Sequence, residues 1–183
     1  GTGLSSVPVQ NISTDYTGRE VSYIAGTPYW GDDMSRHPGP GGNYGEFIAW
    51  NPVTGQKVWG IPEKFLVYSG VLVTGGDIAF YGTVDGWFRA VNARTGKVLW
   101  SQKLGSGIIS DPMTYRGPDG HQYVSVIAGV GGAAMVTKSM PGFPARGGTV
   151  YTFELGSHIQ SIGQTPAAEM TGSAGGKPSG GKR

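Results

Sequence analysis

The chain has 183 residues, of which 34 are glycine, 14% are charged and none is cysteine. This length suffices for one domain with a buried core, and many glycines with few charges favour short, largely buried strands joined by tight turns. The lack of cysteine excludes disulfides, thiolate metal sites and cysteine nucleophiles. A net charge of +2 provides no strongly basic face, so no nucleic-acid partner is expected.

The first 45 residues carry weak strand signals followed by a predicted long loop. Residues 7–9 form a short apolar run, and residues 21–25 have the composition of a strand. Residues 26–45 are rich in glycine and proline, which predicts a loop. A loop of this length is uncommon in a compact domain unless it is functional or crosses between neighbouring units.

A segment of fifteen residues occurs twice at an offset of 41. Residues 45–59 read GEFIAWNPVTGQKVW, and residues 86–100 read GWFRAVNARTGKVLW. Seven positions are identical: Gly45/Gly86, Phe47/Phe88, Ala49/Ala90, Asn51/Asn92, Thr54/Thr95, Gly55/Gly96 and Trp59/Trp100. A chance resemblance between two hairpins would not readily give these identities in register. A period near 40 with strand character is typical of a propeller repeat.

Each copy of the repeat predicts a hairpin. Phe47, Ala49 and Asn51 alternate along the sequence, so they lie on one face of a strand. The Asn-x-x-Thr-Gly segment then turns the chain, with Gly55 free to adopt positive φ. The next strand carries Trp59, whose flat ring suits packing between neighbouring sheets.

The remaining strand signals predict an all-β fold, a set of β-propeller blades. They lie at residues 64–68, 71–73, 77–83, 87–92, 98–103, 111–115, 122–128 and 149–155. We expect two to three blades in residues 1–156 and a flexible Gly/Ser/Lys-rich tail in residues 157–183. A closed propeller has four to eight blades. The chain, which begins at Gly1 rather than Met, is therefore expected to join the rest of a propeller, in a longer parent chain or another subunit.

The residues offer few signs of catalysis. His37, His121 and His158 do not form a recognisable triad, and surface histidines explain them better. The adjacent carboxylates at 32 and 33 lack the regularly spaced oxygen ligands of a calcium loop. Residues 129–132 are glycine-rich but are not followed by a helix pattern or a P-loop lysine. Four other aspartates are expected to cap turns: Asp15, Asp85, Asp111 and Asp119.

Residues 64–70, KFLVYSG, are the most suggestive stretch. Tyr68 is an aromatic with a polar tip, predicted at the end of a short strand beside two small residues. Strand ends and connections between blades line the axial cavity of a propeller, where ligands bind. A tyrosine of the core or the rim is the alternative interpretation.

Residues 65–115, with GDIAFYGTVDG at 76–86, resemble the C-terminal part of the quinoprotein alcohol dehydrogenases. The branch they resemble is the large subunits of methanol and ethanol dehydrogenases, of calcium and lanthanide types. The repeat is similar to the tryptophan-docking motif of that family. Further motifs match in the same order at residues 15–16, 21–26, 38–40, 106–109 and 129–132, so the resemblance covers about residues 7–132.

The resemblance implies an eight-bladed propeller with pyrroloquinoline quinone (PQQ) and a calcium or lanthanide ion on its axis. It also implies oxidation of primary alcohols in the periplasm and transfer of electrons to a c-type cytochrome. The family's metal ligands, catalytic Asp and cofactor-clamping Arg lie upstream of the matched region. The resemblance therefore places no catalytic or metal-binding residue in this chain, which alone is expected to lack activity.

The resemblance places three pocket-lining candidates for cofactor binding in the chain: Tyr68, Gly132 and Ala133. Tyr68 stands where the methanol enzymes have Trp, Ala133 also replaces a Trp, and Ser13 replaces a paired Cys. The more open pocket at Ala133 predicts an alcohol larger than methanol. The alternative is a non-catalytic propeller scaffold, such as the quinoprotein-like lipoproteins of outer-membrane assembly, and a parent without the upstream Asp and metal ligands would favour it.

Overall fold

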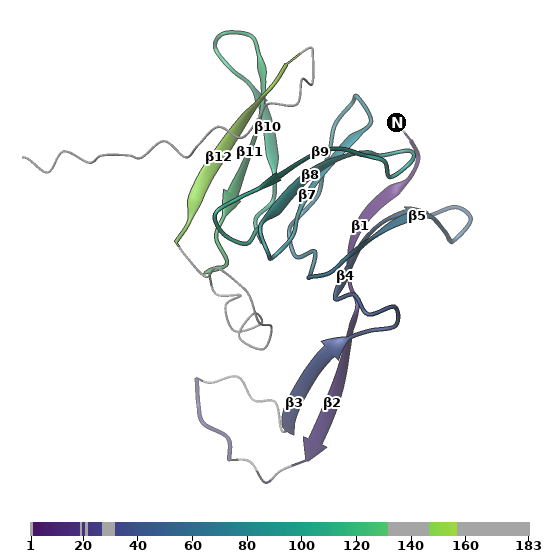
Figure 1. The fold of residues 1–183 in the computed structure, drawn as a ribbon, viewed down its shortest axis with the longest axis vertical. Helices are drawn as coiled ribbons and strands as arrows, with labels where there is room; N and C mark the ends of the chain where they lie inside the picture. The colour runs from purple at the N-terminus through teal and green to yellow at the C-terminus, as the bar shows by residue number, and fades with distance from the viewer. Residues whose placement is uncertain (1, 19, 21, 27–31, 132–146, 157–183) are drawn as a thin grey trace, which may run out of the picture.

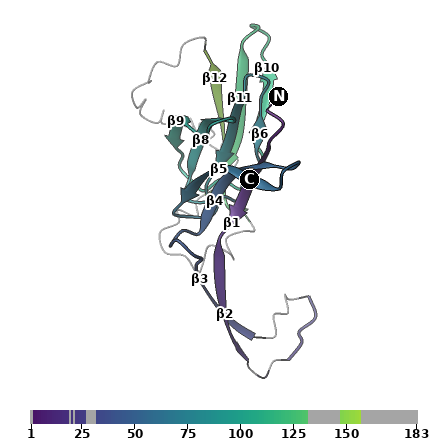
Figure 2. The same ribbon diagram turned by 90° about the vertical axis from the view of Figure 1, so that its right-hand side faces the viewer.

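The computed structural model describes residues 2–18, 20, 22–26, 32–131 and 147–156. Within these residues the regular structure consists of β-strands, which form three antiparallel sheets and one separate hairpin. The three sheets follow one another across the molecule, and the hairpin extends away from them (Figure 1, Figure 2). The described part contains no helix long and apolar enough to cross a membrane.

The second sheet is the most complete of the three and contains four strands in chain order. They are β6 (Leu72–Val73), β7 (Ile78–Gly82), β8 (Trp87–Asn92) and β9 (Val98–Lys103). The first sheet contains β1 (Ser5–Gln10), β4 (Gly45–Asn51) and β5 (Gln56–Glu63). The third contains β10 (Met113–Arg116), β11 (Gln122–Ala128) and β12 (Thr149–Leu155). The hairpin consists of β2 (Ile12–Gly18) and β3 (Asp32–Pro38).

The two sequence repeats form equivalent hairpins, β4–β5 and β8–β9, as predicted. Each carries a register irregularity at the same place, between Ala49 and Trp50 and between Ala90 and Val91. The Asn51 side chain accepts hydrogen bonds from the amides of Val53 and Thr54 at 2.9 and 3.2 Å. The Asn92 side chain accepts the equivalent two at 3.0 Å each, from Arg94 and Thr95. These bonds explain why both copies keep the asparagine.

The tryptophan of the first repeat docks on the turn of the second. The indole N–H of Trp59 donates to the carbonyl of Ala93 at 3.2 Å. A Cβ added to Gly96 would lie 2.8 Å from the Trp59 ring, so glycine lets the ring rest on the backbone. Gly55 and Gly96 both have positive φ, at 67° and 74°, as the turn prediction requires.

Two apolar cores hold the sheets together. Phe47, Tyr81 and Val91 belong to the core between the first and second sheets, which Trp59 helps to cover. Phe88 and Val124 belong to the core between the second and third sheets. Adjacent residues of β7 and β8 therefore point into different cores, as expected for a sheet that is buried on both faces.

We expect Gly96→Ala to lower the free energy of unfolding by about 1–2 kcal/mol more than Gly55→Ala does. Both substitutions place a side chain at positive φ, which costs about 1–2 kcal/mol. Only Gly96 lies against a tryptophan, whereas nothing approaches a Cβ at Gly55 within 4 Å. Urea denaturation of the two variants measures the difference. Equal losses would show that Trp59 does not press on this turn.

The structure contradicts three local predictions. Residues 22–26 contain no strand, and residues 32–38, predicted as loop, form β3 paired with β2. The sequence DDMSRHP of β3 has no apolar alternation, because this hairpin stands away from the sheets and has little apolar face to bury. The predicted strand at 64–68 is wrong, since β5 extends to Glu63 and residues 64–70 form no strand.

Candidate functional site

The connections between blades gather at one end of the sheets. Because the strands are antiparallel, the β5–β6 connection, the β7–β8 turn and the β9–β10 connection lie at the same end, called here the connection end. Backbone hydrogen bonds link these segments in sequence across the sheets: Tyr44 N to Lys64 O (3.4 Å), Val84 N to Leu66 O (3.0 Å), Ile108 N to Thr83 O (3.0 Å) and Gly129 N to Gly107 O (2.7 Å). The β2–β3 hairpin leaves the first sheet at this end too.

The connection end is packed as well as hydrogen-bonded. Leu66 and Val84 are fully buried there, and Ile12, Tyr44 and Ile109 pack around them. This explains why residues 64–70 are apolar without being a strand. The carbonyls of Lys64 and Leu66 accept hydrogen bonds from neighbouring segments instead of from a paired strand. The apolar side chains therefore fill a layer between blades and not one face of a sheet.

Tyr68 lies at this end, on the surface. Tyr68 is 39% exposed among the described residues, so it does not belong to the cores of these sheets. The next residue, Ser69, is buried, and its hydroxyl accepts from Gly82 N at 2.7 Å and donates to Gly70 O at 2.8 Å. The backbone beside Tyr68 is therefore anchored to the end of β7. Within the described residues the Tyr68 hydroxyl has no hydrogen-bond partner.

The other two pocket candidates, Gly132 and Ala133, lie outside the described residues. The structure therefore neither brings them to Tyr68 nor separates them from it, and their assignment stays a prediction. The predicted tail, residues 157–183, also lies outside the described part.

Sequence reasoning overlooked that the 41-residue offset continues beyond the tryptophan motif. Ser69 and Ser110 occupy equivalent positions, and each ties a blade connection to the second strand of the sheet that follows, β7 or β11. The Ser110 hydroxyl accepts from Ile127 N at 3.1 Å and donates to Ile127 O at 2.9 Å. Extending the repeat comparison from residue 59 to residue 70 would have found both serines.

A second overlooked feature is a buried polar group between the first two blades. Glu63, at the end of β5, accepts from the Tyr81 hydroxyl at 2.7 Å and pairs with Arg89, whose Nε lies 2.8 Å from Oε1. The Arg89 Nη2 atom donates to Oε2 at 3.3 Å, whereas the Nε–H is not aimed well enough to make a hydrogen bond. Burial first, and then the charge of Glu63, raise the pKa of Tyr81 well above its ordinary value.

The histidines and aspartates have structural partners in most cases. His37 lies 3.3 Å from Asp15, and His121 lies 2.5 Å from Glu154, so the two described histidines contact separate carboxylates. Asp85 and Asp119 lie in turns as expected: Asp85 accepts from Thr83, and Asp119 accepts from the amide of His121. Two turn-capping predictions are wrong. Asp15 lies within β2, and Asp111 receives no hydrogen bond from any described residue.

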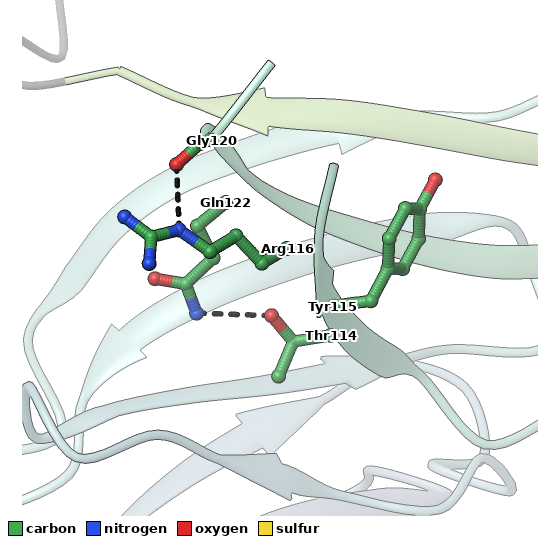
Figure 3. A pocket seen from close by; sticks show the side chains of 5 residues that line it. All are labelled: Thr114, Tyr115, Arg116, Gly120 and Gln122. Carbon is green, nitrogen blue, oxygen red and sulfur yellow. Dashed lines mark hydrogen bonds between the residues drawn. The ribbon is translucent and has the colours of Figure 1, made fainter. Parts of the chain in front are cut away.

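No three metal-binding side chains of the described ranges lie close enough to hold an ion. That the metal ligands belong to an upstream part of a longer chain stays a prediction. An open pocket does exist at the opposite end of the third sheet, around the β10–β11 turn (Figure 3). Its lining residues bond to one another: Arg116 Nε donates to Gly120 O at 3.0 Å, and Gln122 Nε2 donates to Thr114 Oγ1 at 2.9 Å. Because β10 separates this pocket from the connection end, it is distinct from the Tyr68 site.

Comparison with known proteins identifies homologues of this chain. A family model described as the β-propeller domain of glucose, ethanol and alcohol dehydrogenases that use PQQ matches residues 45–124. The lanthanide-dependent methanol dehydrogenase of Methylacidiphilum fumariolicum is 54% identical over 134 residues, covering 72% of this chain and 22% of the relative. The quinoprotein ethanol dehydrogenase of Pseudomonas aeruginosa is 39% identical over 162 residues, covering 85% and 26%. This chain is homologous to the PQQ-dependent methanol and ethanol dehydrogenases.

The structure agrees with this relationship. A europium-containing methanol dehydrogenase superposes with a TM-score of 0.73 at 45% identity, covering 84% of this chain and 31% of that one. The three sheets thus correspond to blades of a β-propeller similar to that of methanol dehydrogenase, which confirms the predicted fold class. The chain spans less than a third of the length of each of these three relatives.

Proposed function

We propose that this chain forms part of the wall of the cofactor cavity in a longer PQQ-dependent dehydrogenase that oxidises primary alcohols. The observation that carries the proposal is Tyr68, held at the connection end by the buried Ser69, with its ring and hydroxyl left available. The named activities of the relatives, methanol and ethanol dehydrogenation, supply the reaction class. The alcohol itself is proposed to be larger than methanol, because Ala133 stands where the resemblance to the methanol enzymes implies a tryptophan.

Tyr68 and its anchored backbone could form one wall of a site for a planar cofactor. A half-exposed aromatic ring on an anchored backbone offers a flat face, and the Tyr68 hydroxyl is a free polar group beside it. When bound, PQQ would accept the two electrons that the alcohol loses, a step that no protein side chain can perform. Calcium or a lanthanide would be held by residues outside the described part. A periplasmic location and a c-type cytochrome as electron acceptor complete the proposal.

Loading the full-length parent protein with cofactor tests the proposal. The cofactor-free protein is mixed with PQQ and either calcium or a lanthanide, and quinone absorbance and dye-linked oxidation of primary alcohols are followed. Saturable uptake with alcohol oxidation is expected, and the more active metal identifies the native ion. A failure to take up PQQ under conditions that load a related dehydrogenase would instead favour the non-catalytic scaffold.

We expect Tyr68→Ala to weaken PQQ binding by about 2- to 10-fold, the equivalent of one lost aromatic contact of about 0.5–1.5 kcal/mol. Tyr115→Ala is the matched control, since Tyr115 is 45% exposed but belongs to the pocket at the opposite end. Titration of PQQ into each cofactor-free variant, followed by absorbance, gives the affinities. An equal effect in both variants would remove Tyr68 from the cofactor wall.

A further inference from the structure

Asp111 brings a carboxylate from the third blade to the segment that carries Tyr68. A Cβ added to Gly70 would lie 1.8 Å from Asp111 Oδ1 and 2.6 Å from its Cγ, so the carboxylate rests directly on the Gly70 backbone. Gly70 is two residues after Tyr68 and next to the anchored Ser69. The absence of a side chain at residue 70 is what allows this close approach.

Asp111 differs from the other carboxylates of the three blades in having no partner. The others each form an ion pair or a hydrogen bond with a side chain: Glu46 with Lys57, Glu63 with Arg89, Asp77 with Arg94, Asp85 with Lys103, Asp119 with Tyr123 and Glu154 with His121. Asp111 is exposed and has neither a hydrogen bond nor an ion pair within the described residues. Its charge is therefore available to a group from outside the described part.

The position of Asp111 points to the axis of the propeller. Residues 70 and 111 are equivalent at the offset of 41, and each lies just before the first strand of its blade, β6 or β10. β6 and β10 are edge strands of their sheets, and near them the two blades are in contact, where a Cβ on Gly82 would meet Ile108 and one on Gly107 would meet the carbonyl of Val84. Blades radiate from the central channel of a propeller, so the edges that converge are the inner ones.

We propose that Asp111 is a specificity-determining residue, which accepts a hydrogen bond from a second donor group, a hydroxyl or an ammonium, on the alcohol substrate. This inference rests on the proposed dehydrogenase function. A carboxylate without a partner at the inner edge disfavours purely apolar substrates and favours those that carry a donor to satisfy it. Hydrogen bonds to a charged group are the stronger ones, so the preference is expected to be about tenfold.

The test compares three alcohols of equal chain length in the cofactor-loaded parent enzyme: 1-propanol, 1,3-propanediol and 3-amino-1-propanol. Asp111→Ala should raise kcat/KM for 1-propanol, because its apolar end no longer meets a carboxylate, and lower kcat/KM about tenfold for the other two, mainly through KM. Asp111→Asn keeps an acceptor oxygen without the charge, so it should impair the amino alcohol more than the diol. Glu46→Gln, whose carboxylate pairs with Lys57 on the first blade, is the control and should change none of the three.

The outcomes distinguish a failure of the proposed dehydrogenase function from a failure of the role assigned to Asp111. If the wild-type enzyme oxidises none of the alcohols after loading, the proposed function fails and this inference falls with it. If 1-propanol is oxidised but Asp111→Ala affects all three substrates equally, or none of them, the function stands and the role of Asp111 is refuted. A loss confined to the amino alcohol in both variants identifies the ammonium as the recognised group, and a loss confined to the diol identifies the hydroxyl.

Discussion

Replacing Glu63 with alanine is expected to lower the free energy of unfolding by about 3–5 kcal/mol. Glu63 is 7% exposed and lies between the first two blades, where it accepts a hydrogen bond from Tyr81 and pairs with Arg89. Its removal leaves a guanidinium and a phenol in a buried interface without their acceptor, which costs more than the lost pairing alone. The substitution therefore acts on the contact between blades, not on the stability of a single sheet.

Glu46→Ala provides the matched comparison. Glu46 also pairs with a cation at 2.9 Å, that of Lys57, but this pair is exposed at the side of the first sheet. Exposed pairs contribute about 0–1 kcal/mol because water and salt screen them. Urea denaturation, followed by tryptophan fluorescence, should thus give a clearly lower free energy of unfolding for Glu63→Ala than for Glu46→Ala. Similar losses for Glu63 and Glu46 would mean that water reaches the interface between the blades.

The sequence predicted those parts of the fold whose signals repeat. β4–β5 and β8–β9 could be recognised because Asn51 and Asn92 make the same turn and both turns end in glycine. The β2–β3 hairpin could not, because a hairpin outside the sheets buries little and needs no alternating pattern. Residues 64–68 are predicted as a strand because apolar composition alone does not distinguish a strand from a packed connection between blades.

Only part of the candidate site could be predicted, because several of its contacts join residues that are far apart in the sequence. Tyr68 could be singled out because it is an aromatic with a polar tip at the end of an apolar run, beside two small residues. The partners of Glu63 come from other strands, β7 and β8, and no local pattern in the sequence connects them. The role of Gly70 depends on a residue 41 positions away, Asp111, and becomes visible only when the repeat is extended and the two blades are in contact.

Phe47→Ala is expected to destabilise the protein by about 3–5 kcal/mol, the usual cost of deleting a buried phenylalanine. Phe47 is fully buried, stacks on Tyr81 with ring centroids 4.2 Å apart, and meets the edge of Trp59 at 5.6 Å. The cavity would open in the same interface that Glu63 holds from the connection end. Val53→Ala, in the exposed turn of the same hairpin, should stay within about 0.5 kcal/mol of the wild type.

A double-mutant cycle of Phe47→Ala with Glu63→Ala shows whether the two contacts hold one interface. Tyr81 touches both residues, through its ring to Phe47 and through its hydroxyl to Glu63. Residues that share a partner usually deviate from additivity by about 0.5–3 kcal/mol, so the combined loss should be smaller than the sum of the single losses. Once either variant has loosened the first blade from the second, the other has less packing left to remove. Strict additivity would instead mean that the apolar and polar halves of the interface separate independently, and that Tyr81 does not couple them.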